Sequence, residues 1–189
     1  MSEEIRSFIA VEIENGEVLK RIIKFKNMIS ELSGASLKPV EDENIHITIR
    51  FLGSIDRTTL DIVKKIIDKL ASLKRFNIHI KGVGGFPSIS RPRVLWVGIE
   101  EGFENLREIR GYIDLNLRGL RVHEDQHEFL PHITIARVKD SIPQKAVQTL
   151  ISYASEDFGF SEVSKIYLKK STLTPRGPIY SNIHFVELS

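Results

Sequence analysis

Residues 131–138 read P-H-I-T-I-A-R-V, and the four-residue segment H-I-T-I occurs once more at residues 46–49. Both copies lie in runs of β-branched and apolar residues, which is the composition of a buried strand. Because side chains alternate faces along a strand, each His shares a face with the Thr two residues later, while the isoleucines point into a core. The repeat therefore predicts two strands that each present one imidazole and one hydroxyl.

Two such strands side by side would place His46, Thr48, His132 and Thr134 around a single phosphate-sized group. A histidine titrates near neutral pH, so one imidazole can act as general base while the other acts as general acid. Each hydroxyl could hydrogen-bond a non-bridging phosphate oxygen and fix the in-line geometry. A lone His in an apolar strand is more often a hydrogen-bonded core residue, but two with the same neighbours favour catalysis.

Composition limits the classes of protein to consider. The chain has 189 residues, 41% of them hydrophobic, which can form a sizeable core. Without cysteine it has no disulfide, thiolate metal site or cysteine nucleophile. A formal net charge of +2 is too small for the whole protein surface to attract nucleic acid, so any affinity for phosphate must be local. No apolar run could span a membrane and the N-terminus lacks a signal-peptide pattern, so we expect a cytoplasmic protein.

Periodicity along the chain predicts an α+β protein. Strands are expected at 5–13, 45–52, 76–80, 94–99, 131–138, 161–171 and 180–188, and helices at 18–32, 56–70, 103–117 and 143–154. A glycine-rich loop is expected over 82–92. Both halves read strand, helix, strand, helix, strand in outline and no linker separates them, so residues 1–189 are expected to form one domain of two pseudo-equivalent lobes.

Further segments occur around the repeat in a fixed order. They are R-S-F-I-A at 6–10, N-I-H-I-T-I-R-F-L-G at 44–53, G-F-P at 85–87, R-P-R-V-L-W-V-G at 91–98 and L-T-P-R-G-P-I-Y at 173–180. With the second motif through Arg137, they make nearly the whole chain resemble the RNA 2′,3′-cyclic phosphodiesterases, also called 2′-5′ RNA ligases, of the two-histidine (2H) phosphoesterase superfamily. The resemblance implies a bilobal fold in which two mainly antiparallel sheets flank a central groove, with helices outside.

The resemblance also implies an activity. A terminal 2′,3′-cyclic phosphate of RNA would be hydrolysed to a 2′-phosphate by acid–base catalysis without a metal or other cofactor. By analogy His132 is the base and His46 the acid, and the reverse reaction would ligate RNA through a 2′-5′ linkage. The expected partner is an RNA end, for which tRNA halves are a candidate. No membrane or obligate protein partner is expected, and the protein is expected to be a monomer.

Two alternative functions stay open at this point. One is a 2H phosphoesterase acting on a small cyclic nucleotide or an ADP-ribose cyclic phosphate. The other is a non-catalytic module that binds RNA ends.

Two arginines are candidate clamps for the phosphate charge. Arg50 is an even number of residues from His46 and should share its face, further along the strand. Arg137 is at an odd step from His132, so a regular strand would point it away from the site. It can bind substrate only if the strand twists or bulges after Ala136.

Phe86, Arg91 and Arg93 are predicted to form an RNA-binding rim, because Arg holds backbone phosphates and an aromatic ring stacks on an unpaired base. Trp96 is expected in the core. The resemblance places Arg176 and Tyr180 on a turn near the groove.

The remaining histidines are not expected to take part in the chemistry. His123 and His127 match the zinc-peptidase word H-E-x-x-H, which binds metal only on a helix. Here the segment has no apolar helical period, so we expect an exposed loop and no metal site. His79 is expected to be solvated and His184 to lie in the core.

Overall fold

The computed structural model describes residues 3–189. Its α-helices are α1 (Gly16–Ser33), α2 (Arg57–Asp68), α3 (Phe103–Leu117) and α4 (Gln144–Ser152). Its strands are β1 (Ile5–Val11), β2 (Leu37–Pro39), β3 (Ile47–Ile55), β4 (Phe76–Phe86), β5 (Val94–Glu101), β6 (His132–Val138), β7 (Asp157–Val163), β8 (Lys165–Thr174) and β9 (Gly177–Glu187). Short 3-10 helices occupy Gly34–Ser36, Asp42–Asn44 and Lys69–Ser72. In this part of the chain, no helix has the length and apolar character needed to cross a membrane.

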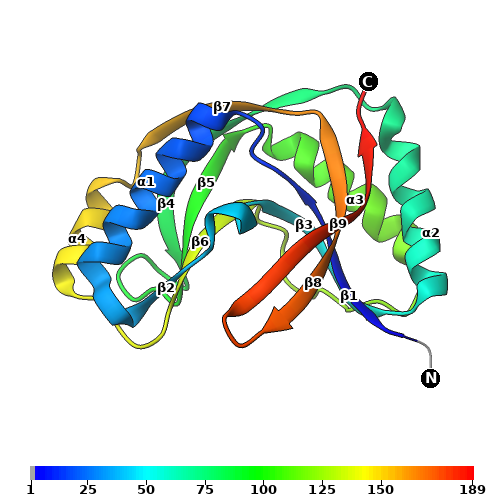
Figure 1. Ribbon diagram of the computed structural model, residues 1–189. Coiled ribbons are helices and arrows are strands. Elements are labelled where there is room, and N and C mark those ends of the chain that lie inside the picture. Colours follow the sequence, from blue (N-terminus) through cyan, green and yellow to red (C-terminus); the bar gives the residue numbers. More distant parts are fainter. Residues whose placement is uncertain (1–2) are drawn as a thin grey trace.

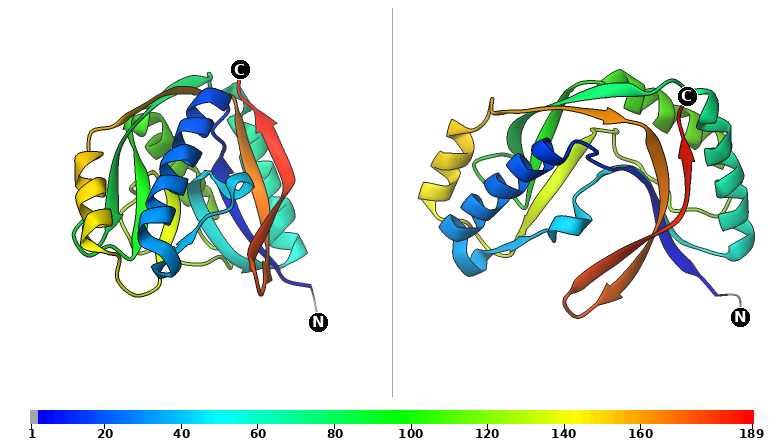
Figure 2. Two further views of the ribbon diagram at one scale, coloured as in Figure 1. Left: turned by 60° about the vertical axis from the view of Figure 1, so that its left-hand side comes forward. Right: turned by 45° about the horizontal axis from the view of Figure 1, so that its top comes forward.

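The strands form two antiparallel halves that meet at the motif strands. The strand order is β7-β4-β5-β6-β3-β1-β8-β9, and β2 pairs with β6. β3 and β6 are joined by a single residue pair, Ile47 with Ile133, so the four strands on each side of this junction curve away as separate sheets (Figure 2). This confirms the predicted α+β class and architecture.

The helices cover the outside of the arch that the strands form (Figure 1). α1 and α4 pack on each other and against the half that contains β4 and β7, whereas α2 and α3 pack at the other end, against strands that include β9 and β3. Two predicted helix starts have side-chain caps. Asn15 accepts hydrogen bonds from the amides of the first turn of α1, and Asp56 accepts from the Thr59 amide at 2.7 Å.

The isoleucines of the repeat lie in the core, as predicted. Ile47, Ile49, Ile133 and Ile135 are completely buried. Burial of one such side chain contributes roughly 1.5–3 kcal/mol. The core therefore fixes which face of each motif strand is turned toward the groove.

The predicted glycine-rich loop over 82–92 is wrong in its first part, because β4 continues to Phe86 and only residues 87–93 are irregular. Within this stretch Gly84 is paired with Trp96 of β5. A Cβ on Gly84 would lie 2.3 Å from an indole carbon of Trp96. Gly84 has no side chain, so the large Trp96 ring can lie across the strand at this position. Close approach of another group is a common reason for a glycine within a strand.

The predicted strand over 161–171 is two strands, β7 and β8, separated at Ser164. The Ser164 amide donates to Glu14 Oε2 at 2.6 Å in place of a ladder bond. β7 pairs with β4 and β8 pairs with β1, so the chain passes from one half of the fold to the other at this residue. Composition does not reveal this break, because it depends on pairing with strands that are distant in sequence.

The predictions for His79 and His184 are also wrong. His79 is buried, stacks on Phe160 with ring centroids 4.2 Å apart, and contacts Asp157 Oδ1 through Nε2 at 2.9 Å. His184 is only half-buried and contacts Asp68 Oδ1 at 2.6 Å. Both environments are created by residues distant in sequence.

Candidate active site

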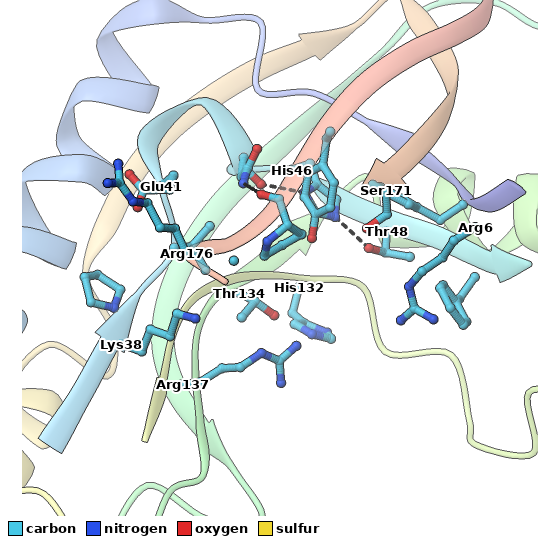
Figure 3. Close-up of a pocket in the computed structure, with 18 residues that line it drawn as sticks. Arg6, Lys38, Glu41, His46, Thr48, His132, Thr134, Arg137, Ser171 and Arg176 are labelled. Carbon is cyan, nitrogen blue, oxygen red and sulfur yellow. Dashed lines mark hydrogen bonds between the residues drawn. The ribbon is translucent and has the colours of Figure 1, made fainter. Parts of the chain in front are cut away.

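The two copies of the repeat lie across from each other on β3 and β6. His46 directly precedes β3 and His132 begins β6. Both histidines, with Thr48 and Thr134, line one groove of about 350 Å³ (Figure 3). The structure therefore brings together the four residues that the repeat predicted.

Backbone carbonyls fix the tautomer of both imidazoles. Nδ1 of His46 is 2.6 Å from the Asn44 carbonyl oxygen, and Nδ1 of His132 is 2.6 Å from that of Leu130. A carbonyl only accepts, so each Nδ1 carries the hydrogen and each Nε2 is available for proton transfer. His46 Nε2 accepts from the Thr48 hydroxyl at 2.8 Å. The two sites thus share one local geometry, with the carbonyl two residues before the His as the orienting group.

The environment favours the neutral form of both histidines. The pKa of His46 is lowered from 6.5 to about 4, mainly by burial. The positive charge of Lys169 also lowers this pKa, whereas the hydrogen bond to the Asn44 carbonyl raises it. Burial also lowers the pKa of His132, and the positive charge of Arg137 lowers it as well. The hydrogen bond to the Leu130 carbonyl has the opposite, weaker effect of raising this pKa. A cationic imidazole in this groove therefore requires an anionic neighbour.

A bulge in each motif strand decides which later residue faces the groove. In β6 the partner of Trp96 is Thr134 and that of Leu95 is Ala136, so one extra residue is inserted between them. Ala136 consequently turns to the core, and Arg137 lines the groove. The bulge lies at Ile135, before Ala136 and not after it as expected, and it turns Arg137 into the groove.

β3 has the same irregularity, with the opposite outcome for its arginine. Ile9 pairs with Arg50 and Ala10 with Thr48, so an extra residue lies between the two β3 positions. Arg50 is therefore buried away from the groove, where its Nε donates to Asp114 at 2.7 Å. Phe51, five residues after His46, lines the groove instead. Arg50 is not placed to clamp the phosphate that the histidines would bind.

The groove is markedly cationic. Arg6, Lys38, Arg137 and Arg176 line it, together with one carboxylate, Glu41. Within residues 3–189 these four cations form no salt bridge, whereas the buried cations Lys26, Arg50, Arg110 and Lys169 each pair with a carboxylate. The small net charge of the chain is thus accompanied by a local excess of positive charge where the histidines lie.

Aromatic rings surround the histidines. Tyr180 contacts His46 edge-on with centroids 5.4 Å apart, and Phe8 lies 5.0 Å from the same imidazole. Phe86 contacts His132 edge-on at 5.1 Å, although it does not line the groove. These rings exclude water from the imidazoles and explain why burial dominates their pKa values.

The other predicted rim residues lie elsewhere. Arg91 and Arg93 are exposed and are not part of the groove lining. Trp96 is half-buried against Phe86, with centroids 5.4 Å apart. The structure therefore places Phe86 beside a histidine but does not bring the two arginines into the site.

The H-E-x-x-H word lies in the irregular segment between α3 and β6, as predicted. His123 and His127 are exposed, and the segment is not helical. His123 instead contacts Phe51 edge-on with centroids 5.3 Å apart. Over residues 3–189 no three His, Asp or Glu side chains are arranged to hold a metal ion.

A family comparison agrees with the two-lobed geometry. The model of the LigT like Phosphoesterase family matches residues 11–96 and matches again over residues 97–180. The chain belongs to this family. Each match contains one copy of the repeat, so the LigT-like phosphoesterase pattern recurs in both halves of the chain.

Relatives of this LigT-like phosphoesterase share most of its length. A protein of Archaeoglobus fulgidus named RNA 2′,3′-cyclic phosphodiesterase is 37% identical over 97% of this chain and 100% of its own. Proteins of the same name from Aeropyrum pernix and Methanocaldococcus jannaschii are each 38% identical, over 88% and 95% of this chain and 94% and 98% of theirs.

Solved structures share the fold. TT0787 of Thermus thermophilus superimposes with a TM-score of 0.81 at 29% identity, covering 97% of this chain and 98% of its own. Escherichia coli LigT complexed with 3′-AMP gives a TM-score of 0.79 at 19% identity, covering 99% of both chains. The arrangement of two lobes is therefore common to this LigT-like phosphoesterase and its structural relatives.

Sequence reasoning did not assign Arg6, Lys38 or Ser171 to the site of this LigT-like phosphoesterase, although all three line the groove. Arg6 had a signal, because it shares the face of Phe8 on β1. Lys38 had almost none, since β2 has only three residues and reaches the groove by pairing with β6.

Proposed function

We propose that the protein hydrolyses the 2′,3′-cyclic phosphate at the end of RNA, leaving a 2′-phosphate. One observation carries the proposal: two imidazoles with available Nε2 atoms lie in one cationic groove, each on a strand that also presents a Thr hydroxyl. The names of the relatives from A. fulgidus and A. pernix support the choice of substrate.

In the proposed reaction His132 Nε2 removes a proton from water as the water oxygen attacks phosphorus. The bond from phosphorus to the ribose 3′-oxygen breaks, and His46 gives its Nε2 proton to that oxygen. The product carries a 2′-phosphate and a 3′-hydroxyl, and the two histidines have exchanged protonation states. Acid–base catalysis of this kind contributes about 10²–10⁴ in rate per group.

His46 takes up the required proton with the substrate. Because its pKa in the free protein is about 4, it is neutral at pH 7. A bound phosphate anion stabilises the imidazolium and raises this pKa. Once Nε2 is protonated it cannot accept from Thr48, so the Thr48 hydroxyl turns its hydrogen to a phosphate oxygen.

Thr134 and Arg137 complete the phosphate site in this proposal. The Thr134 hydroxyl donates to a second non-bridging oxygen, and the Arg137 guanidinium stabilises the charge that develops on the pentacoordinate phosphate. The same groove would accelerate the reverse reaction, in which an RNA 5′-hydroxyl replaces water and a 2′-5′ linkage forms. We place this reaction in the cytoplasm and assign it to a monomer of one domain.

The test uses a short RNA that ends in a 2′,3′-cyclic phosphate, incubated with the purified protein in excess chelator. The products are resolved as 2′- or 3′-phosphates for the wild type, His46→Ala and His132→Ala. His127→Ala, in the exposed segment before β6, is the matched control. We expect a 2′-phosphate, a loss of about 10²–10⁴ in each groove variant, and no change in the control. A 3′-phosphate product, or full activity in either groove variant, would overturn the proposal.

A further inference from the structure

One end of the groove gathers three cations. Lys38 of β2 and Arg137 of β6 are directly opposite each other in the antiparallel ladder, and both line the groove. Arg176 reaches it from the β8–β9 turn, whose Gly177 would bring a Cβ within 3.7 Å of Lys38 Nζ. Glu41 is the one carboxylate in the groove lining, and in residues 3–189 it forms no salt bridge with them.

This arrangement costs stability in the absence of a ligand. Like charges directly opposite on neighbouring strands destabilise a sheet. The backbone nevertheless holds Lys38 in place, because the Val40 amide donates to the Ile135 carbonyl at 2.8 Å and the Lys139 amide donates to Ser36 at 2.8 Å. The repulsion between Lys38 and Arg137 is therefore built into the fold, and an anion between them would relieve it.

The opposite end of the groove has a different character. Because β3 and β6 are antiparallel, Phe51 and Arg137, each five residues after a motif His, lie toward opposite ends. Arg6 lies over the Phe51 ring, 4.7 Å from its centroid. Figure 3 shows Arg6 on one side of the two histidines and Lys38 on the other, with the Arg137 side chain extending toward His132. The two ends of the groove thus differ, with clustered cations at one end and a stacked Arg–Phe pair at the other.

We propose that Lys38, assisted by Arg176, binds the internucleotide phosphate on the 5′ side of the terminal nucleotide, so that the body of the RNA leaves the groove over β2. This inference rests on the proposed function, because it takes the cyclic phosphate to lie between the histidines. It assigns a second phosphate site and a direction to the RNA strand. The protein is then selective for an RNA end over a mononucleotide.

The spacing suits this assignment. Arg137 lies three residues beyond Thr134, and one of these residues is taken up by the bulge. The two positions are therefore roughly 7 Å apart along a strand that rises about 3.3 Å per residue. That length is comparable with the step between neighbouring phosphates of an extended RNA strand. The backbone of Lys38, opposite that of Arg137, therefore lies about one nucleotide away from the site of the reaction. The Arg137 side chain extends back from this position toward His132 (Figure 3), so Arg137 serves the reacting phosphate and Lys38 serves the next one.

The experiment compares kcat/KM for three substrates. They are a mononucleotide 2′,3′-cyclic phosphate, a dinucleotide that ends in the same group, and that dinucleotide with an uncharged methylphosphonate linkage. The proteins are the wild type, Lys38→Ala, Arg6→Ala and the control Lys24→Ala, an exposed lysine outside the groove.

We expect Lys38→Ala to lower kcat/KM about tenfold on the charged dinucleotide, because a charge-assisted hydrogen bond is lost. On the other two substrates kcat/KM should fall by less than about twofold. For the charged dinucleotide, the slope of log kcat/KM against log salt should also become shallower by about 0.7, the value for one phosphate contact on a single strand. Arg6→Ala should affect the mononucleotide and the dinucleotide equally, and Lys24→Ala neither.

Three outcomes would overturn the inference. Equal losses of Lys38→Ala on all substrates would mean that the lysine acts on the reacting phosphate or on the fold. A dinucleotide-specific loss in Arg6→Ala alone would reverse the direction of the RNA. No loss on any substrate would remove Lys38 from the site. Failure of the wild type on every substrate would instead refute the proposed function itself.

Discussion

The two histidines give the free protein a pH dependence that can be worked out from their surroundings. The reactive state carries one proton on the pair, so kcat/KM falls at low pH when the base is protonated and at high pH when the acid is deprotonated. The pKa of His46 is about 4 and that of His132 is below 6.5. The maximum of kcat/KM is therefore expected between these two values.

The size of the effect follows from the titration. Above the upper pKa the rate constant falls tenfold per pH unit, so kcat/KM should decline steadily toward alkaline pH. The decline of kcat should begin at higher pH than that of kcat/KM, because the bound phosphate raises the pKa of His46. Initial rates on a dinucleotide 2′,3′-cyclic phosphate between about pH 3.5 and 9 measure both profiles.

The cause of the lowered pKa of His46 can be tested separately. Tyr180→Ala removes a ring packed edge-on against His46 and admits water, so the pKa of His46 should rise toward 6.5. An NMR titration of the imidazole signals, assigned with His46→Ala, reads this pKa directly. A wild-type His46 pKa at or above 6.5, or a kcat/KM that continues to rise to pH 8, would refute the reasoning.

Four further variants test packing and charge. Arg110→Ala removes a buried guanidinium that pairs with Asp114 and Asp125 and donates to the Ile49 carbonyl. It should cost about 1–3 kcal/mol in denaturant unfolding, and no measurable cost would contradict this. Gly84→Ala should destabilise by about 1–3 kcal/mol through its clash with Trp96, whereas Gly111→Ala, with open space around it, should stabilise α3 by roughly 0.5–1 kcal/mol. Equal effects of the two glycine variants would count against that explanation. Arg137→Ala should lower kcat/KM by about 10²–10³ without lowering the unfolding midpoint, and a lowered midpoint would point to a structural role.

The central part of the site could be predicted from the sequence because it is local. The period-two pattern of H-I-T-I fixes which side chains share a face, and the buried isoleucines confirm it. The caps of Asn15 and Asp56 are local as well, since each side chain bonds to amides within the next three residues. Such features depend on only a few consecutive residues.

The remaining features depend on long-range pairing. Arg50 and Arg137 exchange their expected orientations because each motif strand bulges against a partner that is distant in sequence. Lys38 enters the groove through a three-residue strand, and His79 is buried by strands on both sides of β4. No local periodicity encodes a bulge or a partner strand, so these positions required the structure.

The central claim is that His46 protonates the leaving 3′-oxygen while His132 activates water. A 2′,3′-cyclic substrate with sulfur in place of the bridging 3′-oxygen tests this most directly, because a thiolate leaves without a proton. His46→Ala should lose about 10²–10⁴ on the oxygen substrate and under about tenfold on the sulfur substrate, whereas His132→Ala should lose about 10²–10⁴ on both. Equal losses of His46→Ala on the two substrates, or rescue of His132→Ala by sulfur, would contradict the account.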